Sequence, residues 1–203
     1  NECGLICSEF VDWSGSLVKS SATMDSLPCF TFAKTGNNWS YVVTKATADT
    51  CELQKIIGSK SGSYYFGGES THSCGWPMQN IPLKWTVSPS EFTIREDLSL
   101  TRHEIYIPVY AKYGVTYRSY PYPDTVTLTL TDTNLYITTV AGNFFCNKYR
   151  YTESSVINNV RNTRISDIWL DHHNGIIRQE VTSPNDTSDI IRQVLKTKSF
   201  QGN

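Results

Sequence analysis

The sequence predicts an all-β protein built from antiparallel strands, with little helix. Three observations indicate this class. Apolar and polar residues alternate with a period of two from residue 83 onward, which is the pattern of strands that bury one face. Turn-forming residues interrupt this pattern about every ten residues, a spacing typical of all-β domains. Val, Ile, Thr and Tyr are frequent along the chain, and helices disfavour these residues.

The clearest strand runs from residue 125 to 131. Three apolar residues alternate there with four threonines, so one face is apolar and the other carries hydroxyl groups. The Asp-Thr-Asn run at 132–134 predicts a turn, after which the chain returns as a strand over 135–140. The other expected strands are 40–46, 51–57, 83–87, 91–96, 104–111, 113–118, 144–151, 165–172, 176–183 and 189–198.

We expect one β domain over residues 28–200, preceded by an irregular N-terminal segment at 1–27, because no linker divides the chain. Residues 58–82 are rich in Gly and Ser and predict a long loop. A disulfide through Cys74 would hold this loop in place.

Two local features modify this assignment. Short helical turns are expected at most at 24–27 and 154–161. Pro108 lies inside the expected strand 104–111 and cannot donate a hydrogen bond to a neighbouring strand. It therefore predicts an edge strand or a bulge.

The cysteines indicate an exported protein. There are six of them, without a CxxC pair or another metal-ligand spacing, and disulfides are typical of exported proteins. The chain begins with Asn rather than Met, which favours a mature form trimmed of a signal segment. Cys146 shares a strand face with Phe144. We therefore expect Cys146 to be buried as a small hydrophobic residue instead of forming a disulfide. The disulfide candidates, whose pairing stays open, are Cys3, Cys7, Cys29, Cys51 and Cys74.

Charge, hydropathy and motifs exclude several functions. A net charge of −1 provides no basic surface for nucleic acid, and no apolar run reaches the ~18–20 residues of a transmembrane helix. Catalytic motifs, phosphate-binding glycine loops and metal-ligand sets are absent from the sequence, so we expect no cofactor, no metal and no enzymatic activity. A hydrolase is a less favoured alternative, since four scattered carboxylates could meet in the fold: Glu91, Asp97, Glu104 and Asp124.

The segment YRSYPYPD, at 117–124, is a candidate ligand-binding loop. Tyr117, Tyr120 and Tyr122 have aromatic faces that could stack against a sugar or a peptide, with Arg118 beside them. The alternative is a rigid loop whose tyrosines fold back over the edge of the sheet.

The segment 171–175, Asp-His-His-Asn-Gly, predicts the tip of a β-hairpin. Asn174-Gly175 is a preferred pair for a two-residue type I′ turn, because both positions need a positive φ. This register places Asp171 opposite Arg178 as a cross-strand ion pair. The two adjacent histidines point to opposite faces and cannot easily share a metal ion. We therefore expect a solvent-facing tip without a metal.

Three segments resemble a family of exported bacterial proteins, many of them from the Bacteroidetes and known only as hypothetical lipoproteins. FTFAKTGNNWSYVV at 30–43 is similar to the family's F-P-L-x-x-G-N-x-W-x-Y opening. TTVAGNFFCNKYRY at 138–151 is similar to its V-x-x-P-A-G-x-F-x-C-x-x-Y strand pair, and ISDIWLDHHNGIIRQEV at 165–181 to its closing hairpin. The resemblance implies a single curved antiparallel sheet, or half-barrel, in the style of lipoprotein-carrier and periplasmic lipid-binding folds. It implies no shared activity.

The residues of these segments predict structural roles. Trp39 and Tyr41 lie two positions apart, on one strand face, where large aromatic residues usually form core. Phe144 is expected on an inward face, and Trp169 is also expected to have a structural role. Gly142 lies in a tight connection and is expected to take a positive φ.

We therefore expect a non-enzymatic exported β-domain, located in the periplasm, at the outer membrane or outside the cell. It would bind a lipid or another apolar ligand, or act as an accessory subunit of a surface complex with protein partners. An apolar ligand requires a concave sheet with one apolar face, whereas accessory packing requires an exposed aromatic patch. The alternative is a carbohydrate- or adhesion-type β-sandwich that binds through the tyrosine loop.

Overall fold

The computed structural model describes residues 10–11, 17–18, 30–45, 50–61, 64–72, 81–87, 91–96, 105–108, 111–119, 125–157, 160–184 and 186–200. Within these ranges the regular elements are all strands, which confirms the all-β class. In chain order they are β1 (Phe10–Val11), β2 (Leu17–Val18), β3 (Asn38–Lys45), β4 (Thr50–Ser61), β5 (Tyr64–His72), β6 (Ile81–Val87), β7 (Glu91–Glu96), β8 (Ile105–Pro108), β9 (Thr116–Ser119), β10 (Thr125–Thr139), β11 (Gly142–Ile157), β12 (Val160–Asp171), β13 (Gly175–Ser183) and β14 (Asp186–Ser199).

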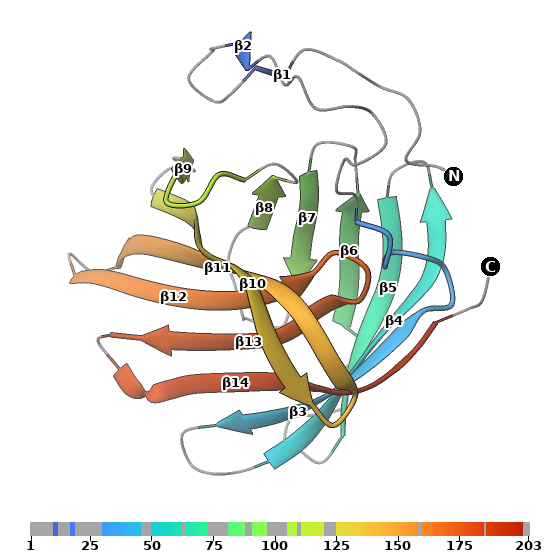
Figure 1. The fold of residues 1–203 in the computed structure, drawn as a ribbon. Helices are drawn as coiled ribbons and strands as arrows, with labels where there is room; N and C mark the ends of the chain where they lie inside the picture. Colours follow the sequence, from blue (N-terminus) through green and yellow to red (C-terminus); the bar gives the residue numbers. More distant parts are fainter. Residues whose placement is uncertain are drawn as a thin grey trace.

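Strands β3 to β14 form one antiparallel sheet that curves without closing into a barrel (Figure 1). Their order across the sheet is β8-β7-β6-β5-β4-β3-β14-β13-β12-β11-β10-β9. Two meanders, β3–β8 and β9–β14, are therefore joined where β3 pairs with β14. β8 and β9 follow each other in the chain but lie at opposite edges of the sheet. The edge position expected from Pro108, the last residue of β8, is confirmed.

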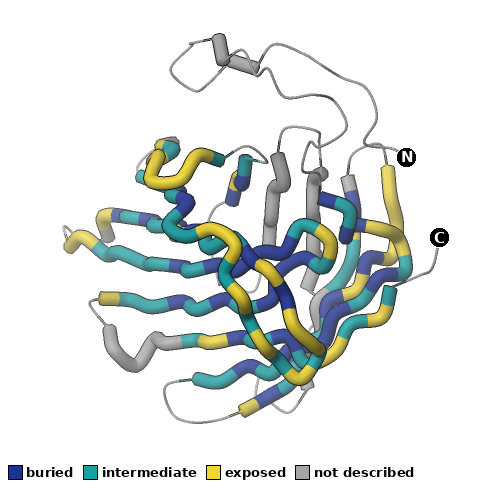
Figure 2. The backbone as a smooth tube through the Cα atoms, viewed as in Figure 1, coloured by how far each residue is buried: buried dark blue, intermediate teal, exposed yellow. Residues whose placement is uncertain are grey.

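The inward face of the curved sheet forms the hydrophobic core. On β10, Val126, Leu128 and Leu130 are buried while the threonines between them are half-buried, as the alternation predicts. Trp39 and Tyr41 are fully buried on β3. Figure 2 shows the same alternation of buried and more exposed residues along the neighbouring strands. The period-two pattern therefore locates the core correctly.

The turn expected at residues 132–134 is wrong. β10 runs through this region to Thr139 and stays paired with β11, with register shifts on either side of Asp132. Asn134 takes a positive φ of 54°, which Asn tolerates better than most residues, and Asn147 on β11 accepts a hydrogen bond from its backbone N–H. Turn-forming residues thus produce bulges inside one long strand instead of a reversal.

The long loop expected at 58–82 is also wrong in its first half, because β4 extends to Ser61 and β5 occupies 64–72. Gly67 explains part of the error: a Cβ at this position would lie 1.9 Å from the backbone oxygen of Ile56 on the paired strand. Glycine here permits close approach of two strands instead of marking a loop.

The helical turn expected at 154–161 is a further error, because β11 and β12 pair there up to Ile157 and Val160. The other one, at 24–27, lies outside the described residues. The boundary between an N-terminal segment and the β domain stays a prediction.

Candidate functional site

A two-stranded ribbon at the end of β10 and β11 extends beyond the rest of the sheet; we call residues 135–146 the hairpin arm. Its two strands pair with each other around a turn at Val140-Ala141. The pairing of β10 with β9 ends at Thr129, and that of β11 with β12 starts at Asn147. Within the described ranges, no other strand pairs with the arm.

The arm has one buried and one exposed face. Phe144 and Cys146 point inward and are 4% and 0% exposed. Tyr136 and Phe145 on the outer face are 57% and 65% exposed, and their rings meet edge to face at 5.3 Å. Val140 at the turn is 83% exposed. The two faces alternate because adjacent strand residues point to opposite sides of the ribbon.

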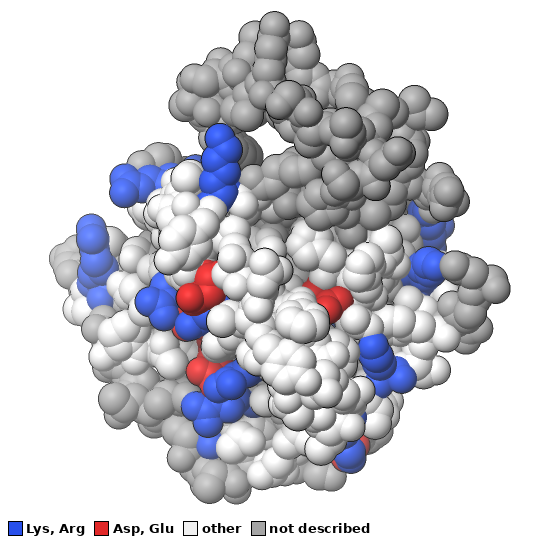
Figure 3. All heavy atoms as spheres, viewed as in Figure 1, with Lys and Arg blue, Asp and Glu red and all other residues white. Residues whose placement is uncertain are grey.

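The outer face of the arm carries no charge. Residues 133–147 contain no Asp, Glu, Lys or Arg, and Figure 3 shows the front of the molecule over the arm as an uncharged area. Beside the exposed aromatic pair, the Thr138 hydroxyl donates a 3.0 Å hydrogen bond to Asn143 Oδ1 across the ribbon. Gly142 next to the turn has a φ of 129°, which confirms its expected positive value. The arm therefore presents an apolar and hydroxylated surface on a regular hairpin.

The arm rests on the C-terminal end of β14. Lys198 lies over the ring of Phe144 at 4.9 Å and over that of Phe200 at 5.3 Å, and its ammonium donates to Asn174 Oδ1. Partial burial lowers the pKa of Lys198, against an opposing effect of Asp171. These contacts fix the inner face of the arm to the hairpin tip at 171–175.

The register expected for that tip is wrong. Asp171 pairs with Gly175, which leaves a three-residue turn and a bulge between Trp169 and Leu170. The Asp171 carboxylate explains the difference, because its Oδ1 accepts hydrogen bonds from the backbone N–H groups of His173 and Asn174 at 2.8 and 2.9 Å. An Asp side chain that binds the backbone in this way stabilises a longer turn than Asn-Gly alone would form. The expected ion pair of Asp171 with Arg178 is therefore absent.

Most of the tip is covered instead of facing solvent, and His173 is its exposed residue. The Phe30 ring stacks on His172 at 4.9 Å, and the Thr31 N–H donates to the His172 carbonyl at 3.0 Å. Trp39 Nε1 donates to the Asn174 carbonyl at 2.8 Å, which gives this core tryptophan a polar partner. Residues 30–33 have no strand pattern, so their position against the tip could not be predicted from sequence.

Burial determines the chemistry of two side chains near the tip. It raises the pKa of the Cys146 thiol to about 12, with a further contribution from Asp171, so Cys146 stays protonated and unreactive. It lowers the pKa of His172, although Asp171 acts in the opposite direction. No group of three or more His, Cys, Asp and Glu side chains suited to a metal occurs in the described ranges.

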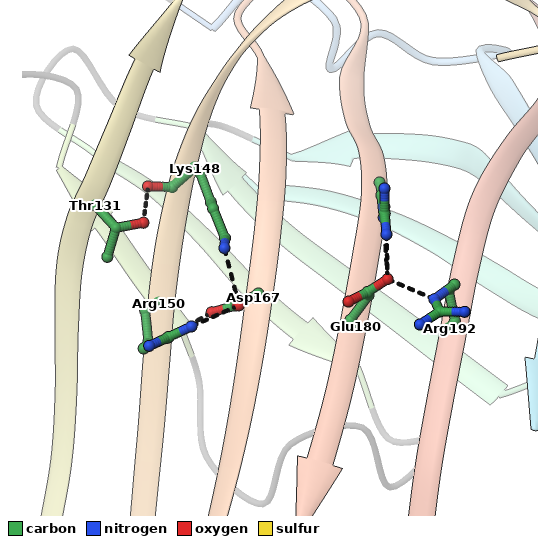
Figure 4. Close-up of polar contacts among 7 residues, drawn as sticks. Thr131, Lys148, Arg150, Asp167, Glu180 and Arg192 are labelled. Atoms are coloured by element: carbon green, nitrogen blue, oxygen red, sulfur yellow. Dashed lines mark hydrogen bonds and ion pairs between the residues drawn. The ribbon is translucent and has the colours of Figure 1, made fainter. Parts of the chain in front are cut away.

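Two clusters of ion pairs lie on the outer face of β11–β14 (Figure 4). Asp167 binds Arg150 Nε at 2.7 Å and Lys148 Nζ at 3.1 Å. Burial alone would raise the pKa of Asp167, but these hydrogen bonds lower it below its usual value. Trp169 is covered by Lys148 on one side and Arg178 on the other, at 4.8 and 4.7 Å from its ring.

The second cluster has the same form, because Glu180 accepts from both Arg178 and Arg192. Its pKa is also lowered by these partners, against the effect of burial. Each carboxylate is thus shared by two cations. The charges in each cluster therefore neutralise one another. Ion pairs that are exposed to solvent contribute little to stability.

A row of buried polar side chains crosses the concave face. Gln193 Nε2 donates to Gln179 Oε1, and Gln179 Nε2 donates to Ser166 Oγ at 2.9 Å. All three residues are at least 98% buried. The row ends at Gln193 Oε1, which has no hydrogen-bond partner.

The structure describes two of the four candidate ligand-binding residues, Tyr117 and Arg118. Tyr117 is half-buried on β9, and its hydroxyl accepts a 3.1 Å hydrogen bond from the Lys112 backbone N–H. Arg118 is exposed and, as the next strand residue, points to the opposite face. Tyr120 and Tyr122 lie outside the described residues.

The structure describes two of the six cysteines, Cys51 and Cys146. Cys146 is free and buried, which confirms its expected role. Cys51 is buried on β4 and is not among the free cysteines. A disulfide of Cys51 stays a prediction, as do those of Cys3, Cys7, Cys29 and Cys74.

Sequence reasoning missed Tyr136, Val140 and Phe145 as candidate functional residues. Alternation predicts which face of a strand is apolar, but not that a hairpin extends beyond its neighbours. One signal was present, because 133–147 is a fifteen-residue run of strand and turn without a charge.

Two solved structures have a similar fold. A candidate lipoprotein from Parabacteroides distasonis is 15% identical, with a TM-score of 0.61 over 86% of this chain and 100% of its own. A candidate exported protein from Bacteroides fragilis, described as having a YmcC-like fold, is 13% identical, with a TM-score of 0.59 over 85% of this chain and 100% of its own. No family model and no curated protein matches the chain.

These identities show the fold alone. The curved antiparallel sheet implied by the sequence resemblance is confirmed, and both neighbours come from the Bacteroidetes. The individual motif correspondences stay a prediction. The described part of the chain also contains no helix long and apolar enough to cross a membrane.

Proposed function

We propose that this chain is a non-enzymatic exported β-domain that acts as an accessory subunit of a surface complex. It docks on a protein partner through the outer face of the hairpin arm. The observation that carries this proposal is the exposure of Tyr136, Phe145 and Val140 on an uncharged ribbon. Export is supported by the two structural neighbours, one a candidate lipoprotein and the other a candidate exported protein.

The composition of the arm fits a protein interface. The cores of such interfaces are enriched in aromatic residues and depleted of charges, and large aromatic residues contribute most of the binding energy. The inner face of the arm is already packed, so binding would order few additional side chains.

A photo-crosslinking amino acid at position 145 tests this function in cells that make the protein. We expect one dominant crosslinked product, which the Tyr136→Ser substitution removes. Tyr113 is the matched control, because it is an aromatic residue with 69% exposure outside the arm. Equal products from both positions, or none from position 145, would contradict the proposal.

A second function, binding of an apolar ligand by the concave face, is favoured by the polar row on β12–β14. A buried acceptor without a partner is costly, and Gln193 Oε1 would be satisfied by a ligand that donates a hydrogen bond. Lipid extraction and mass spectrometry of natively purified protein test this function. A ligand retained by the wild type and lost from the Gln193→Leu variant would support it.

Sugar or peptide binding at Tyr117, Arg118, Tyr120 and Tyr122 remains a further proposal. The half-buried Tyr117 ring leaves Arg118 as the exposed member among the described residues. Replacement of Arg118 by Ala should lower affinity for such a ligand if the loop binds it.

A further inference from the structure

The backbone of the hairpin arm has an unpaired edge. Paired residues in an antiparallel ribbon alternate between hydrogen-bonded and non-hydrogen-bonded positions, and the pair that closes a two-residue turn is hydrogen-bonded. Thr139 and Gly142 close the turn of the arm. Counting back from them, Tyr136 and Thr138 direct their N–H and C=O groups away from β11.

Nothing in the described structure pairs with this edge. β9 covers β10 only as far as Thr129, and the neighbouring bridge joins Tyr113 to Leu130. Residues 135–139 therefore form a five-residue strand edge whose outward backbone groups meet none of the other described strands. Such an edge is a template for another extended chain.

The edge also lacks the usual protection against pairing. Its sequence, Leu-Tyr-Ile-Thr-Thr, has high β propensity and contains no proline and no charge. The bulges around Asp132 limit its length but leave its last five residues regular. A lipid surface would not suit this edge, because hydrocarbon cannot satisfy backbone N–H and C=O groups.

We infer that the edge of β10 at residues 135–139 pairs with the same edge of a second copy of this chain, antiparallel about a twofold axis. In a twofold interface each copy presents the same patch. A charged residue near the axis would therefore lie opposite the same residue of the second copy and be repelled by it. The run 133–147 carries no charge, which makes the arm electrostatically compatible with itself. Antiparallel pairing would satisfy the outward groups of Tyr136 and Thr138 in both copies.

This homodimer is distinct from the proposed docking function. Pairing uses the backbone edge of β10, whereas docking uses the side chains on the outer face of the arm. A dimer would place two such faces next to each other, but either property can exist without the other.

Two proline variants of the full chain test the dimer. Thr138→Pro removes an outward N–H from the β10 edge, and Asn143→Pro removes the corresponding N–H from the opposite edge of the arm. Both lose the hydrogen bond between Thr138 and Asn143, so they are matched in their effect on the ribbon. Molar mass is measured by sedimentation equilibrium over about a hundredfold range of concentration.

We expect a dimer for the wild type and for Asn143→Pro, and at least about a tenfold weaker dimer for Thr138→Pro. A monomeric wild type, or equal dimerisation of both variants, would overturn the inference. If Thr138→Pro fails to fold, amide hydrogen exchange of the wild type decides. The Tyr136 and Thr138 amides should exchange more slowly as concentration rises, and exchange independent of concentration would exclude the dimer.

Discussion

His172 is held in its neutral form by its surroundings. Its ring stacks on Phe30, its Nδ1 is buried without a hydrogen-bond partner, and Nε2 lies 3.5 Å from the Asn147 amide nitrogen. Burial has the largest effect and lowers its pKa, the nearby Asp171 acts in the opposite direction, and His173 lowers it further. A second proton on Nε2 would face the Asn147 amide nitrogen, which is itself a donor, while Asn147 Oδ1 accepts from the Asn134 N–H.

This environment predicts a loss of stability in mild acid. The pKa of His172 is lower in the folded chain than the value near 6.5 of an unfolded chain, so the unfolded state binds more protons. The stabilisation is present above the unfolded pKa and is lost as pH falls through the folded one. Urea denaturation at a series of pH values measures it.

The control for this pH dependence is the adjacent histidine. His172→Gln should flatten the decline of the unfolding free energy just below pH 6.5. His173→Gln should retain most of this decline, because the burial that lowers the pKa of His172 remains. An equal slope in wild type and His172→Gln would show that other groups cause it. Asp167 and Glu180 titrate at lower pH, since their pKa values are lowered.

The conformation of Gly175 leads to a second prediction about a single residue. Its φ is 84°, and a Cβ there would lie 3.2 Å from the Phe32 ring. Gly175→Ala should destabilise the fold by about 1–3 kcal/mol from backbone strain and crowding. Gly114→Ala is the control, because its φ of 75° imposes the strain while its surroundings are open. Equal losses in denaturation experiments would mean that Phe32 does not pack against the tip.

The sequence was most informative about the individual strands. Period-two alternation predicted the inward residues of β10 and the aromatic residues of β3, because burial of one sheet face follows directly from side-chain direction. It could not predict that Asp132 and Asn134 form bulges, since the same residues suit a turn and a bulge. Nor could it predict the register at Asp171, which depends on a side chain that binds its own turn.

Two neighbouring phenylalanines on the arm test its orientation. Phe144 is buried and Phe145 is exposed, although they are adjacent in one strand. Phe144→Ala should lower the unfolding free energy by about 3–5 kcal/mol, and Phe145→Ala should change it by about 0.5 kcal/mol or less. Chemical denaturation of both variants measures the difference. Similar losses would contradict the two-faced arm.

The whole molecule is a rolled sheet whose two edge strands, β8 and β9, follow each other in the chain. The antiparallel class was predictable from local pattern, but the junction of β3 with β14 was not, because it joins strands from the two ends of the domain. The arm was unpredictable for the same reason. The arm is a candidate site only because the strands beside it end before it does.

At this scale we also predict at least one disulfide among Cys3, Cys7, Cys29, Cys51 and Cys74. Closing a loop of some tens of residues would stabilise the fold by ~3–4 kcal/mol. Intact mass before and after reduction and alkylation measures it, in protein made by an oxidising route. Cys146 should resist alkylation until the chain unfolds, because it is buried and its pKa is raised. Six reactive thiols in the unfolded chain, without a reductant, would contradict the prediction.

If the outer face of the arm joins this chain to a partner, the native size of the assembly that contains the chain should show it, in gentle extracts of the cells that make it. We expect an assembly larger than a homodimer for the wild type and for Tyr113→Ser. This assembly should be lost in the Tyr136→Ser/Phe145→Ser double variant. A double variant that is folded and remains in the same large assembly would contradict it.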